Sequence, residues 1–393
     1  MQAGVTAYPL DGVLVADLSR VLAGPLAAMM LADLGATVVK VERPGEGDET
    51  RTWGPPWTAT TSSYFESVNR SKRSVCLDFT DDADAALARE LCARADVVIE
   101  NYRPGSLERF GLSFDDVRRA NPRVVYCSIS GFGSHGAGAG LPGYDFVVQA
   151  IGGLMSITGS ATGEPAKVGV AVVDVLAGKD AVVGILAALR HRDATGVGQR
   201  VEVDLMSSLL SGLVNQASGY LAAGTDPQRL GNRHPSIAPY EMLRCSDGLL
   251  AVAVGNDGQF ARFVEALRAP GLASDTRFAT NAARVANRDE LAQLLEQQLA
   301  TSSAREWEQR IRAAGIACGR VNTIGKAIAY ADKLGLEPLV DVGDGRLPQV
   351  RSPIRLSATP SGRPVAPPSL GQHTDEVKRW LNAASDAELP PLA

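Results

Sequence analysis

Apolar residues come in short blocks in the first part of the chain, and between these blocks they recur with helical spacing. The block Val13–Leu18 predicts a buried strand, and the Gly24–Pro25 step predicts the start of a helix, because proline suits the first helical position. The helix is expected over residues 26–34 and the next strand over residues 37–41. Strand, helix and strand in this order predict a βαβ unit.

The same alternation continues to about residue 205. It predicts strands at 74–79, 97–100, 124–129 and within 195–205, and helices at 83–95, 114–120, 146–155 and from 174 through 189. Strands that alternate with helices are typical of a doubly wound, mainly parallel sheet. We therefore expect an α/β fold whose large domain is Rossmann-like.

The pattern changes after about residue 225. Residues 231–255 predict a loop and two strands joined by an Asp-Gly turn, and three helices follow, at 259–268, at 288–299 and around Trp307. These elements favour a second, smaller α+β domain. The expected division is a large domain over 1–205 and 340–393, a linker helix over 206–224, a small domain over 225–330 and a linker over 331–339. The Pro-rich tract 362–371 also reads as a linker, and Thr374 as the N-cap of a final helix.

Composition narrows the classes of partner. The 393 residues, 45% of them apolar, suffice for two domains and a substantial core. The net charge of −5 is spread without a basic block, so no electrostatic footprint for nucleic acid or an anionic membrane is present. The chain has no signal-peptide pattern and no apolar run of the roughly 18 residues that a membrane span needs. We expect a cytoplasmic protein that acts on small molecules.

Cysteine and histidine positions argue against several familiar chemistries. The five cysteines and four histidines are dispersed, without metal-ligand spacing or a G-x-S-x-G elbow. Cys92 and Cys127 fall inside helix and strand patterns, where small core residues are expected. No metal site is expected, and classical hydrolase chemistry is disfavoured.

Glycine positions argue against a dinucleotide or a P-loop. The first strand-to-helix turn has Gly24 alone instead of G-x-G-x-x-G, which disfavours a nicotinamide or flavin enzyme with Glu42 on the ribose. The glycine run 131–140 lacks the Lys-Ser or Lys-Thr pair of a P-loop. The helix start at Gly24–Pro25 still suits an anionic or polar group.

Asp174 is the single carboxylate in the apolar run Val168–Gly178, where a buried strand pattern turns into a helix pattern. An acid at such a junction either caps the helix or takes part in chemistry. The local sequence leaves both interpretations open.

Eight sequence blocks, in order, are similar to those of the class III coenzyme A transferases. They are VLAGPLAAMMLADLGATVVKVERPGEGDETR, NRSKRSVCLDF, ENYRPGSLERFGL, LPGYDF, VAVVDVLAG, GNRHPSIAPY, GIACGRV and LGQHTDEV. The resemblance runs from Leu10 to Val377. This superfamily includes formyl-CoA, carnitine and bile-acid CoA transferases and the α-methylacyl-CoA racemases, and its transferases are interlocked homodimers in which each chain forms a ring threaded by its partner.

The resemblance implies that Asp174 is a nucleophile. Its carboxylate would attack an acyl-CoA thioester, giving a mixed anhydride and then an aspartyl-CoA thioester that the acceptor carboxylate attacks in turn. Acyl-CoA and a carboxylic acid would be the substrates, with no metal or tightly bound cofactor. We expect the helix N-terminus to keep the carboxylate ionised and neighbouring amides to stabilise the tetrahedral oxyanion.

The resemblance also implies a set of CoA-binding residues. The first loop, the nucleotide-flanking segment, two arginines and two later loops would supply Val21, Leu22, Ala23, Arg43, Leu77, Asp78, Phe79, Thr80, Asn101, Tyr102, Arg103, Arg109, Pro142, Gly143, Tyr144 and Asp145. Arg43 would meet the adenine or phosphate end. Leu22 and Pro142 replace a Gln and a Lys of formyl-CoA transferase, which disfavours oxalate or formate and leaves the phosphates to Arg103 or Arg43.

The sequence defines the acyl-CoA donor and the acceptor acid less well. We expect succinyl-CoA as donor and a small dicarboxylic acid as acceptor, with Arg20, Arg51 and Arg73 as candidate partners of the second carboxylate. The segment 231–240 stands where formyl-CoA transferase has a glycine-rich lid, so His234 either lies near the acyl site or stabilises its own loop.

Two other functions stay open from the sequence. The racemase branch shares the fold but carries His in a GHD motif where this chain has Tyr144, and a phenol with a pKa of about 10 is a poor base at neutral pH. A CoA-binding protein without activity is the other alternative, which the presence of Asp174 disfavours.

Overall fold

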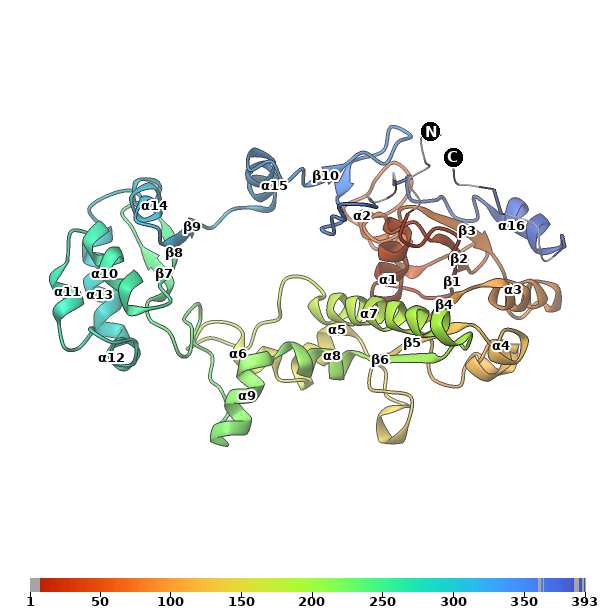
Figure 1. Ribbon diagram of the computed structural model, residues 1–393, viewed down its shortest axis with the longest axis horizontal. Helices are drawn as coiled ribbons and strands as arrows, with labels where there is room; N and C mark the ends of the chain where they lie inside the picture. The colour runs from red at the N-terminus through yellow and green to blue at the C-terminus, as the bar shows by residue number, and fades with distance from the viewer. Residues whose placement is uncertain (1–7, 360–361, 363, 385–388, 391, 393) are drawn as a thin grey trace. The chain divides into compact units, whose positions relative to one another are not determined.

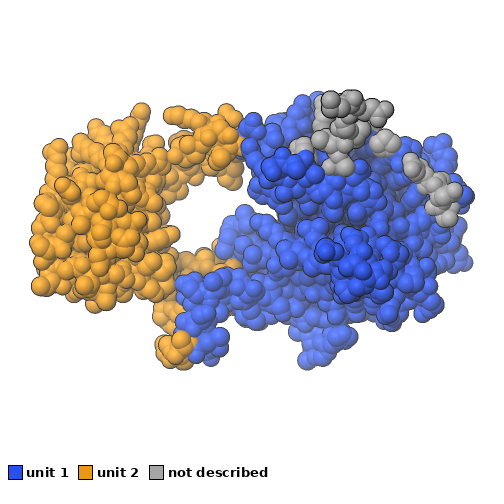
Figure 2. All heavy atoms as spheres, in the orientation of Figure 1, with its two compact units in different colours: residues 1–152, 168–221, 337–393 blue, residues 153–167, 222–336 orange. Residues whose placement is uncertain are grey.

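The computed structural model describes residues 8–359, 362, 364–384, 389–390 and 392. The chain forms two compact units, one of residues 1–152, 168–221 and 337–393 and one of residues 153–167 and 222–336 (Figure 2). Among the described residues, no helix is both long enough and apolar enough to span a lipid bilayer.

A six-stranded parallel sheet forms the centre of the first unit (Figure 1). Its strand order is β3-β2-β1-β4-β5-β6, so the chain reverses direction across the sheet between β1 and β4. The strands are β1 (Leu14–Asp17), β2 (Thr37–Glu42), β3 (Lys72–Cys76), β4 (Val97–Glu100), β5 (Val125–Ser130) and β6 (Arg200–Asp204). The expectation of a doubly wound α/β fold is confirmed.

Helices cover the sheet in two groups. The helices of the first unit are α1 (Ala23–Asp33), α2 (Ser63–Glu66), α3 (Asp82–Arg94), α4 (Phe114–Ala120), α5 (Asp145–Ile151), α7 (Val172–Thr195), α8 (Leu205–Gly212) and α16 (Thr374–Leu381). Helix α6 (Leu154–Ile157) belongs to the second unit, and α9 (Val214–Ala223) contains residues of both units. Helix α1 packs on α7, which runs along β5 and β6, whereas α3 contacts α4 and α16 (Figure 1). A buried cluster joins Val39 and Val98 of the sheet to Leu91 of α3, Val117 of α4 and Trp380 of α16.

The second unit is built on a small antiparallel sheet of order β7-β8-β9. The two-residue strands β10 (Leu339–Val340) and β11 (Gln349–Val350) belong to the first unit. The second unit contains β7 (Tyr240–Arg244), β8 (Leu249–Ala253), β9 (Ala317–Arg320), α10 (Asp257–Ala266), α11 (Gly271–Ser274), α12 (Asn281–Ala286), α13 (Arg288–Leu299), α14 (Ala304–Ala313) and α15 (Ile324–Lys333). Phe263, Leu295, Trp307 and Ile311 fill its core. The Asp-Gly turn lies between β7 and β8, where the sequence predicted it, because Arg244 and Leu249 on either side of the turn pair with each other.

Three local expectations were wrong. The run before Asp174 forms no strand, and Val170 in it is exposed. The helix expected over 146–155 breaks at Gly152 and Gly153, where Gly153 adopts a φ of 87° that ends α5 and starts α6. Thr374 is the first residue of α16 and not its N-cap; its hydroxyl accepts from the Cys76 amide at 3.0 Å.

Candidate active site

A groove lies where the parallel strands end, since the loops after β1, β4 and β5 meet at that edge of the sheet. Ligands in open α/β sheets bind at such an edge. A cavity of about 280 Å³ is formed there by Val21, Leu22, Ala23, Asn101, Tyr102, Arg103, Pro142, Gly143, Tyr144 and Asp174, among others. The structure therefore gathers around one cavity ten residues that lie up to 153 positions apart in the sequence.

A second, larger cavity of about 910 Å³ adjoins the first. It gathers Arg43, Leu77, Asp78, Phe79, Thr80 and Arg109. Arg20, Glu49 and Tyr102 line both cavities, so the two are neighbouring parts of one groove. With one exception, Asp145, the groove contains every CoA-binding residue that the sequence predicted.

Asp174 lies in the first turn of α7, and its side chain does not cap that helix. The N-cap is Ala171, which has no side-chain acceptor. The Asp174 amide and the Val173 amide donate to Oδ1 of Asp145, at 3.3 and 2.7 Å. Asp145 therefore caps α7, and it is not among the residues that line either cavity.

The first loop holds α1 tightly against α7. Val21 adopts a φ of 69°, a left-handed conformation that is costly for a β-branched residue and is found where surrounding structure enforces it. A Cβ on Gly24 would meet Ser19 at 2.3 Å, and one on Gly178 would meet the Ala23 carbonyl oxygen at 2.7 Å. Gly24 lets α1 approach Ser19 in the loop after β1, and Gly178 lets the N-terminus of α1 approach the turn of α7 that follows Asp174.

Comparison with known proteins identifies the family. The model of the CoA-transferase family III matches residues 10–374. The chain belongs to this family. It is 42% identical over 97% of its length to the succinate–glutarate CoA-transferase of Agrobacterium fabrum, 98% of which is covered, and 39% identical over 94% of its length to the succinyl-CoA:glutarate CoA-transferase of Mus musculus, 85% of which is covered.

A solved structure agrees with this assignment. A CaiB/BaiF family protein from Brucella suis superposes with a TM-score of 0.86 at 42% identity, covering 95% of this chain and 100% of that chain. The protein is therefore a CoA transferase, an enzyme that moves CoA from a CoA thioester to a carboxylic acid.

The environment of Asp174 in this CoA transferase differs from the expectation of a permanently ionised carboxylate. Burial, and next the nearby charge of Asp145, raise the pKa of Asp174 to about 7. Among the described residues, the Asp174 carboxylate has no hydrogen-bond partner that would offset this. The surroundings of Asp174 therefore oppose its ionisation.

The amides at the start of α7 are also not free for an oxyanion. Those of Val173 and Asp174 bind Asp145, while those of Val172 and Val175 donate to the carbonyl oxygens of Val170 and Ala171. These four amides at the start of α7 therefore already have acceptors within the protein.

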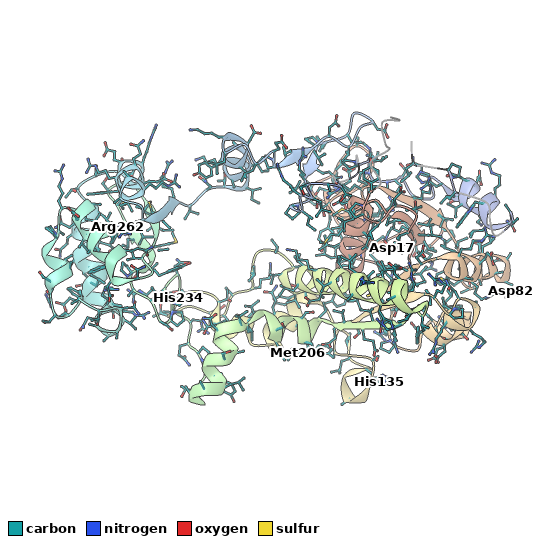
Figure 3. All side chains as sticks on the ribbon, viewed as in Figure 1. Asp17, Asp82, His135, Met206, His234 and Arg262 are labelled. Carbon is teal, nitrogen blue, oxygen red and sulfur yellow. The ribbon has the colours of Figure 1, made fainter. Side chains whose placement is uncertain are left out.

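Beneath the groove, buried ion pairs join β1, β2 and β3. Lys72 donates to Asp17 Oδ2 at 2.8 Å, and Lys40 lies 2.9 Å from Asp48 Oδ2. Burial lowers the pKa of Lys72 to about 8, whereas Asp48 and Asp17 outweigh burial and raise that of Lys40. Asp17 lies within this packed region of the first unit (Figure 3). The pairs fix the loop 43–53 that borders the larger cavity.

The three arginines considered as partners of a second substrate carboxylate differ in what they bind. Arg51 makes two bonds of 2.7 Å to Glu42, and Arg73 is buried against Glu376 and the Pro390 carbonyl oxygen. Arg20 alone of the three lines the cavity that contains Asp174. Its guanidinium pairs with Glu49 and lies over the Tyr102 ring, and its Nε has no hydrogen-bond partner.

Sequence reasoning missed Tyr64. Burial, and next the charges of Asp174, Asp145 and Asp48, raise the pKa of Tyr64 to about 12. Tyr64 packs against the same buried cluster as Val175, the residue after Asp174. Tyr64 also packs edge-on against Trp53, with ring centroids 5.4 Å apart. No local signal singles it out, because the segment SSYF reads as an ordinary helix start.

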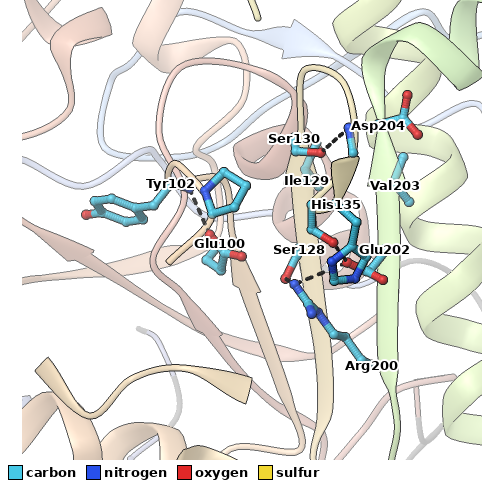
Figure 4. A pocket seen from close by; sticks show the side chains of 13 residues that line it. Glu100, Tyr102, Ser128, Ile129, Ser130, His135, Arg200, Glu202, Val203 and Asp204 are labelled. Carbon is cyan, nitrogen blue, oxygen red and sulfur yellow. Dashed lines mark hydrogen bonds and ion pairs between the residues drawn. The ribbon is translucent and has the colours of Figure 1, made fainter. Parts of the chain in front are cut away.

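A polar pocket borders the groove along β4, β5 and β6 (Figure 4). Glu100, Ser128 and Arg200 face it, and His135 from the glycine-rich loop lies close to Glu202 (Figure 4). Burial raises the pKa of Glu100. Tyr102 and Ser130 line both this pocket and the cavity of Asp174.

His234 belongs to the second unit and makes contacts within its own loop. Its ring packs on Tyr240 with centroids 5.2 Å apart, its Nδ1 accepts from the Ser236 amide, and its carbonyl oxygen accepts from Arg288. These bonds favour the loop-stabilising interpretation of His234 (Figure 3).

Proposed function

We propose that Asp174 is the nucleophile of a succinyl-CoA:dicarboxylate CoA transferase, with glutarate as the representative acceptor. The observation that carries this proposal is the placement of Asp174 in one cavity with the loops that the family resemblance assigns to CoA. The glutarate and succinate named for the relatives supply the substrate pair.

The reaction proceeds through four acyl exchanges. The Asp174 carboxylate attacks the thioester carbonyl carbon, the carbon–sulfur bond breaks and CoA leaves as a thiolate. The thiolate attacks the Asp174 carbonyl of the mixed anhydride, which releases succinate and leaves an aspartyl-CoA thioester. The acceptor carboxylate repeats the first step on this thioester, and the thiolate then takes the acceptor acyl group and restores the Asp174 carboxylate. No net proton is consumed, and each step has a good leaving group.

The N-terminus of α1 supplies the oxyanion donors in this proposal. Its first turn borders the cavity at Leu22 and Ala23, its N-cap has no side-chain bond, and Gly178 brings it close to α7. Amides at a helix N-terminus favour negative charge, and one oxyanion donor is worth roughly 100-fold or more in rate.

CoA extends along the groove from the small cavity to the large one. The thioester end lies by Asp174, and the pantetheine arm passes Arg20 and Tyr102, which border both cavities. The nucleotide occupies the larger cavity. Its walls carry Arg43, Leu77, Asp78, Phe79, Thr80 and Arg109.

Arg20 binds the distal carboxylate of the acceptor. Among the three arginines considered for this role, it alone reaches the cavity of Asp174, because Arg51 and Arg73 are committed to buried partners. A guanidinium binds a carboxylate in a bidentate fork, and the Arg20 side chain is 43% exposed and held only by a partly exposed pair with Glu49.

The enzyme acts as a cytoplasmic, interlocked homodimer. Large apolar side chains are exposed on α5, α7, α8 and α9, which is unusual for surface that only water contacts. They are Phe146, Ile151, Val183, Leu210, Val214 and Leu221.

Trapping the intermediate tests the nucleophile. Incubation with succinyl-CoA should leave a hydroxylamine-sensitive adduct that peptide mass spectrometry places on Asp174, and Asp174→Ala should abolish both adduct and exchange while it still binds CoA. Asp180→Asn, an exposed acid on the same helix, is the matched control and should form the adduct normally. Full transferase activity in Asp174→Ala would falsify the mechanism, and α-proton exchange from deuterated water would indicate a racemase instead.

A further inference from the structure

Asp145 and Gln149, one helical turn apart on α5, hold the segment that leads into Asp174. Asp145 Oδ1 accepts from the Val173 and Asp174 amides, and its Oδ2 accepts from Gln149 Nε2 at 2.6 Å. Gln149 is fully buried, and its Oε1 accepts from the Val168 amide at 2.9 Å. One face of α5 therefore fixes the backbone from residue 168 to the nucleophile itself.

This arrangement separates the capping of α7 from its chemistry. An aspartate in the first turn of a helix often binds its own helix amides, which would satisfy its carboxylate and turn it away from a ligand. Here Asp145 takes those amides from another helix. The Asp174 carboxylate is left without such a bond, at the wall of the cavity.

We propose that Asp145, held by Gln149, is a positioning residue for Asp174: it caps α7 in place of the nucleophile and keeps the Asp174 carboxylate free for acyl capture. This inference rests on the proposed role of Asp174 as nucleophile. It assigns Asp145 to the protein scaffold of the reaction and not to the CoA ligands.

The charge of Asp145 has a second consequence, because it opposes ionisation of its neighbour. After burial, it is the cause that brings the pKa of Asp174 to about 7. The other titratable or charged groups that face the cavity of Asp174 are Arg20, Glu49 and Arg103, and Tyr64 of α2 interacts with Asp174 electrostatically. The first two turns of α1 and all of α8 carry no titratable side chain. Asp145 is thus the charge to remove in a test of this effect.

The raised pKa of Asp174 determines how adduct formation should depend on pH. A raised pKa means that the reactive carboxylate form is gained as pH rises through about 7, so adduct formation should increase there. Asp145→Asn keeps an oxygen acceptor for the amides but removes the charge. The rising limb of the plot of adduct-formation rate against pH should then move to lower pH, by about one unit.

The experiment measures the initial rate of adduct formation on Asp174 from pH 5 to 9, with the whole enzyme and succinyl-CoA. Asp247→Asn is the matched control, because Asp247 accepts from the Ala304 amide at the start of α14, at 2.7 Å, and lines neither cavity of the groove. It should leave the limb unchanged. Circular dichroism and the Kd for CoA are recorded for every variant.

The outcomes separate the two proposals. A folded Asp145→Asn enzyme whose limb stays at the wild-type pH overturns the positioning role, and so does a weakened Kd for CoA with an unshifted limb, which would make Asp145 a ligand. Adduct in Asp174→Ala overturns the nucleophile instead. If Asp145→Asn fails to fold, Gln149→Ala is the deciding variant. A loss of roughly 10- to 100-fold in the rate of adduct formation at an unchanged Kd for CoA supports the positioning role, and a wild-type rate overturns it.

Discussion

At the scale of single residues, the groove depends on what each charged side chain already binds. Arg51 and Arg73 have the chemistry of carboxylate ligands, yet both are engaged by buried partners. Glu42, a possible ribose ligand in a dinucleotide enzyme, is held by Arg51 and Ser74. Arg20 keeps an exposed pair with Glu49 and a free Nε, so it alone of the three arginines can exchange a partner for a substrate.

Arg20→Ala should therefore raise the KM for glutarate by about tenfold or more and change the KM for a monocarboxylic acceptor of similar length much less. The reason is that only the dicarboxylate loses a charge-assisted hydrogen bond, worth roughly 1.5–3 kcal/mol. Steady-state kinetics with the two acceptors measures this. Arg118→Ala, on the surface of α4, is the control. Equal effects on both acceptors together with a weaker Kd for CoA would place Arg20 on the CoA phosphates.

At the scale of elements, the groove is built on strands whose polar residues are buried in pairs. Lys72 begins β3 and donates to Asp17, to Asn69 Oδ1 and to the Pro25 carbonyl oxygen, each within 2.9 Å. It thereby joins β3 to β1 and to the first turn of α1. The position of the first loop depends on this lysine although it contacts no ligand.

Lys72→Met should lower the free energy of unfolding by about 3–5 kcal/mol, because it leaves Asp17 buried with one cation fewer. Urea unfolding followed by circular dichroism measures the change. Lys179→Met, an exposed lysine on α7, should change it little. The double variant Asp17→Asn with Lys72→Met should recover part of the loss, and a double variant less stable than Lys72→Met alone would contradict the pairing.

At the scale of the whole molecule, the chain leaves a large apolar surface around α8 and α9. Leu221 is 80% exposed and Val214 67% exposed, which is costly in water at about 25 cal/mol per Å² of apolar surface. The chain mass is 41.3 kDa. A partner chain would cover this surface.

Light scattering should therefore give twice the chain mass. If the two chains are interlocked, differently tagged dimers mixed under native conditions should not exchange subunits over days, because a ring must open first. Mixing after unfolding and refolding should give the mixed dimer. Rapid native exchange would show a dimer without interlocking, and a species of single chain mass would contradict the dimer itself.

The fold and most of the groove follow from the sequence alone. The alternation of strand and helix patterns determines a parallel sheet, and in such a sheet the loops after β1, β4 and β5 end at one edge. Motif residues as distant as Leu22, Asn101 and Tyr144 must then meet there. The type of each element can be predicted locally, because the spacing of apolar residues shows which face of that element is buried.

Only the tertiary structure decided how Asp174 is held. The apolar run before it matches a strand, but the run forms none, and its Val168 amide binds the side chain of Gln149 instead. Its helix is capped by Asp145, 28 positions earlier in the chain. Tyr64 reaches it from a segment that carries no signal of its own. The packing of the elements determines which residues distant in sequence form hydrogen bonds, and a local sequence pattern does not predict that packing.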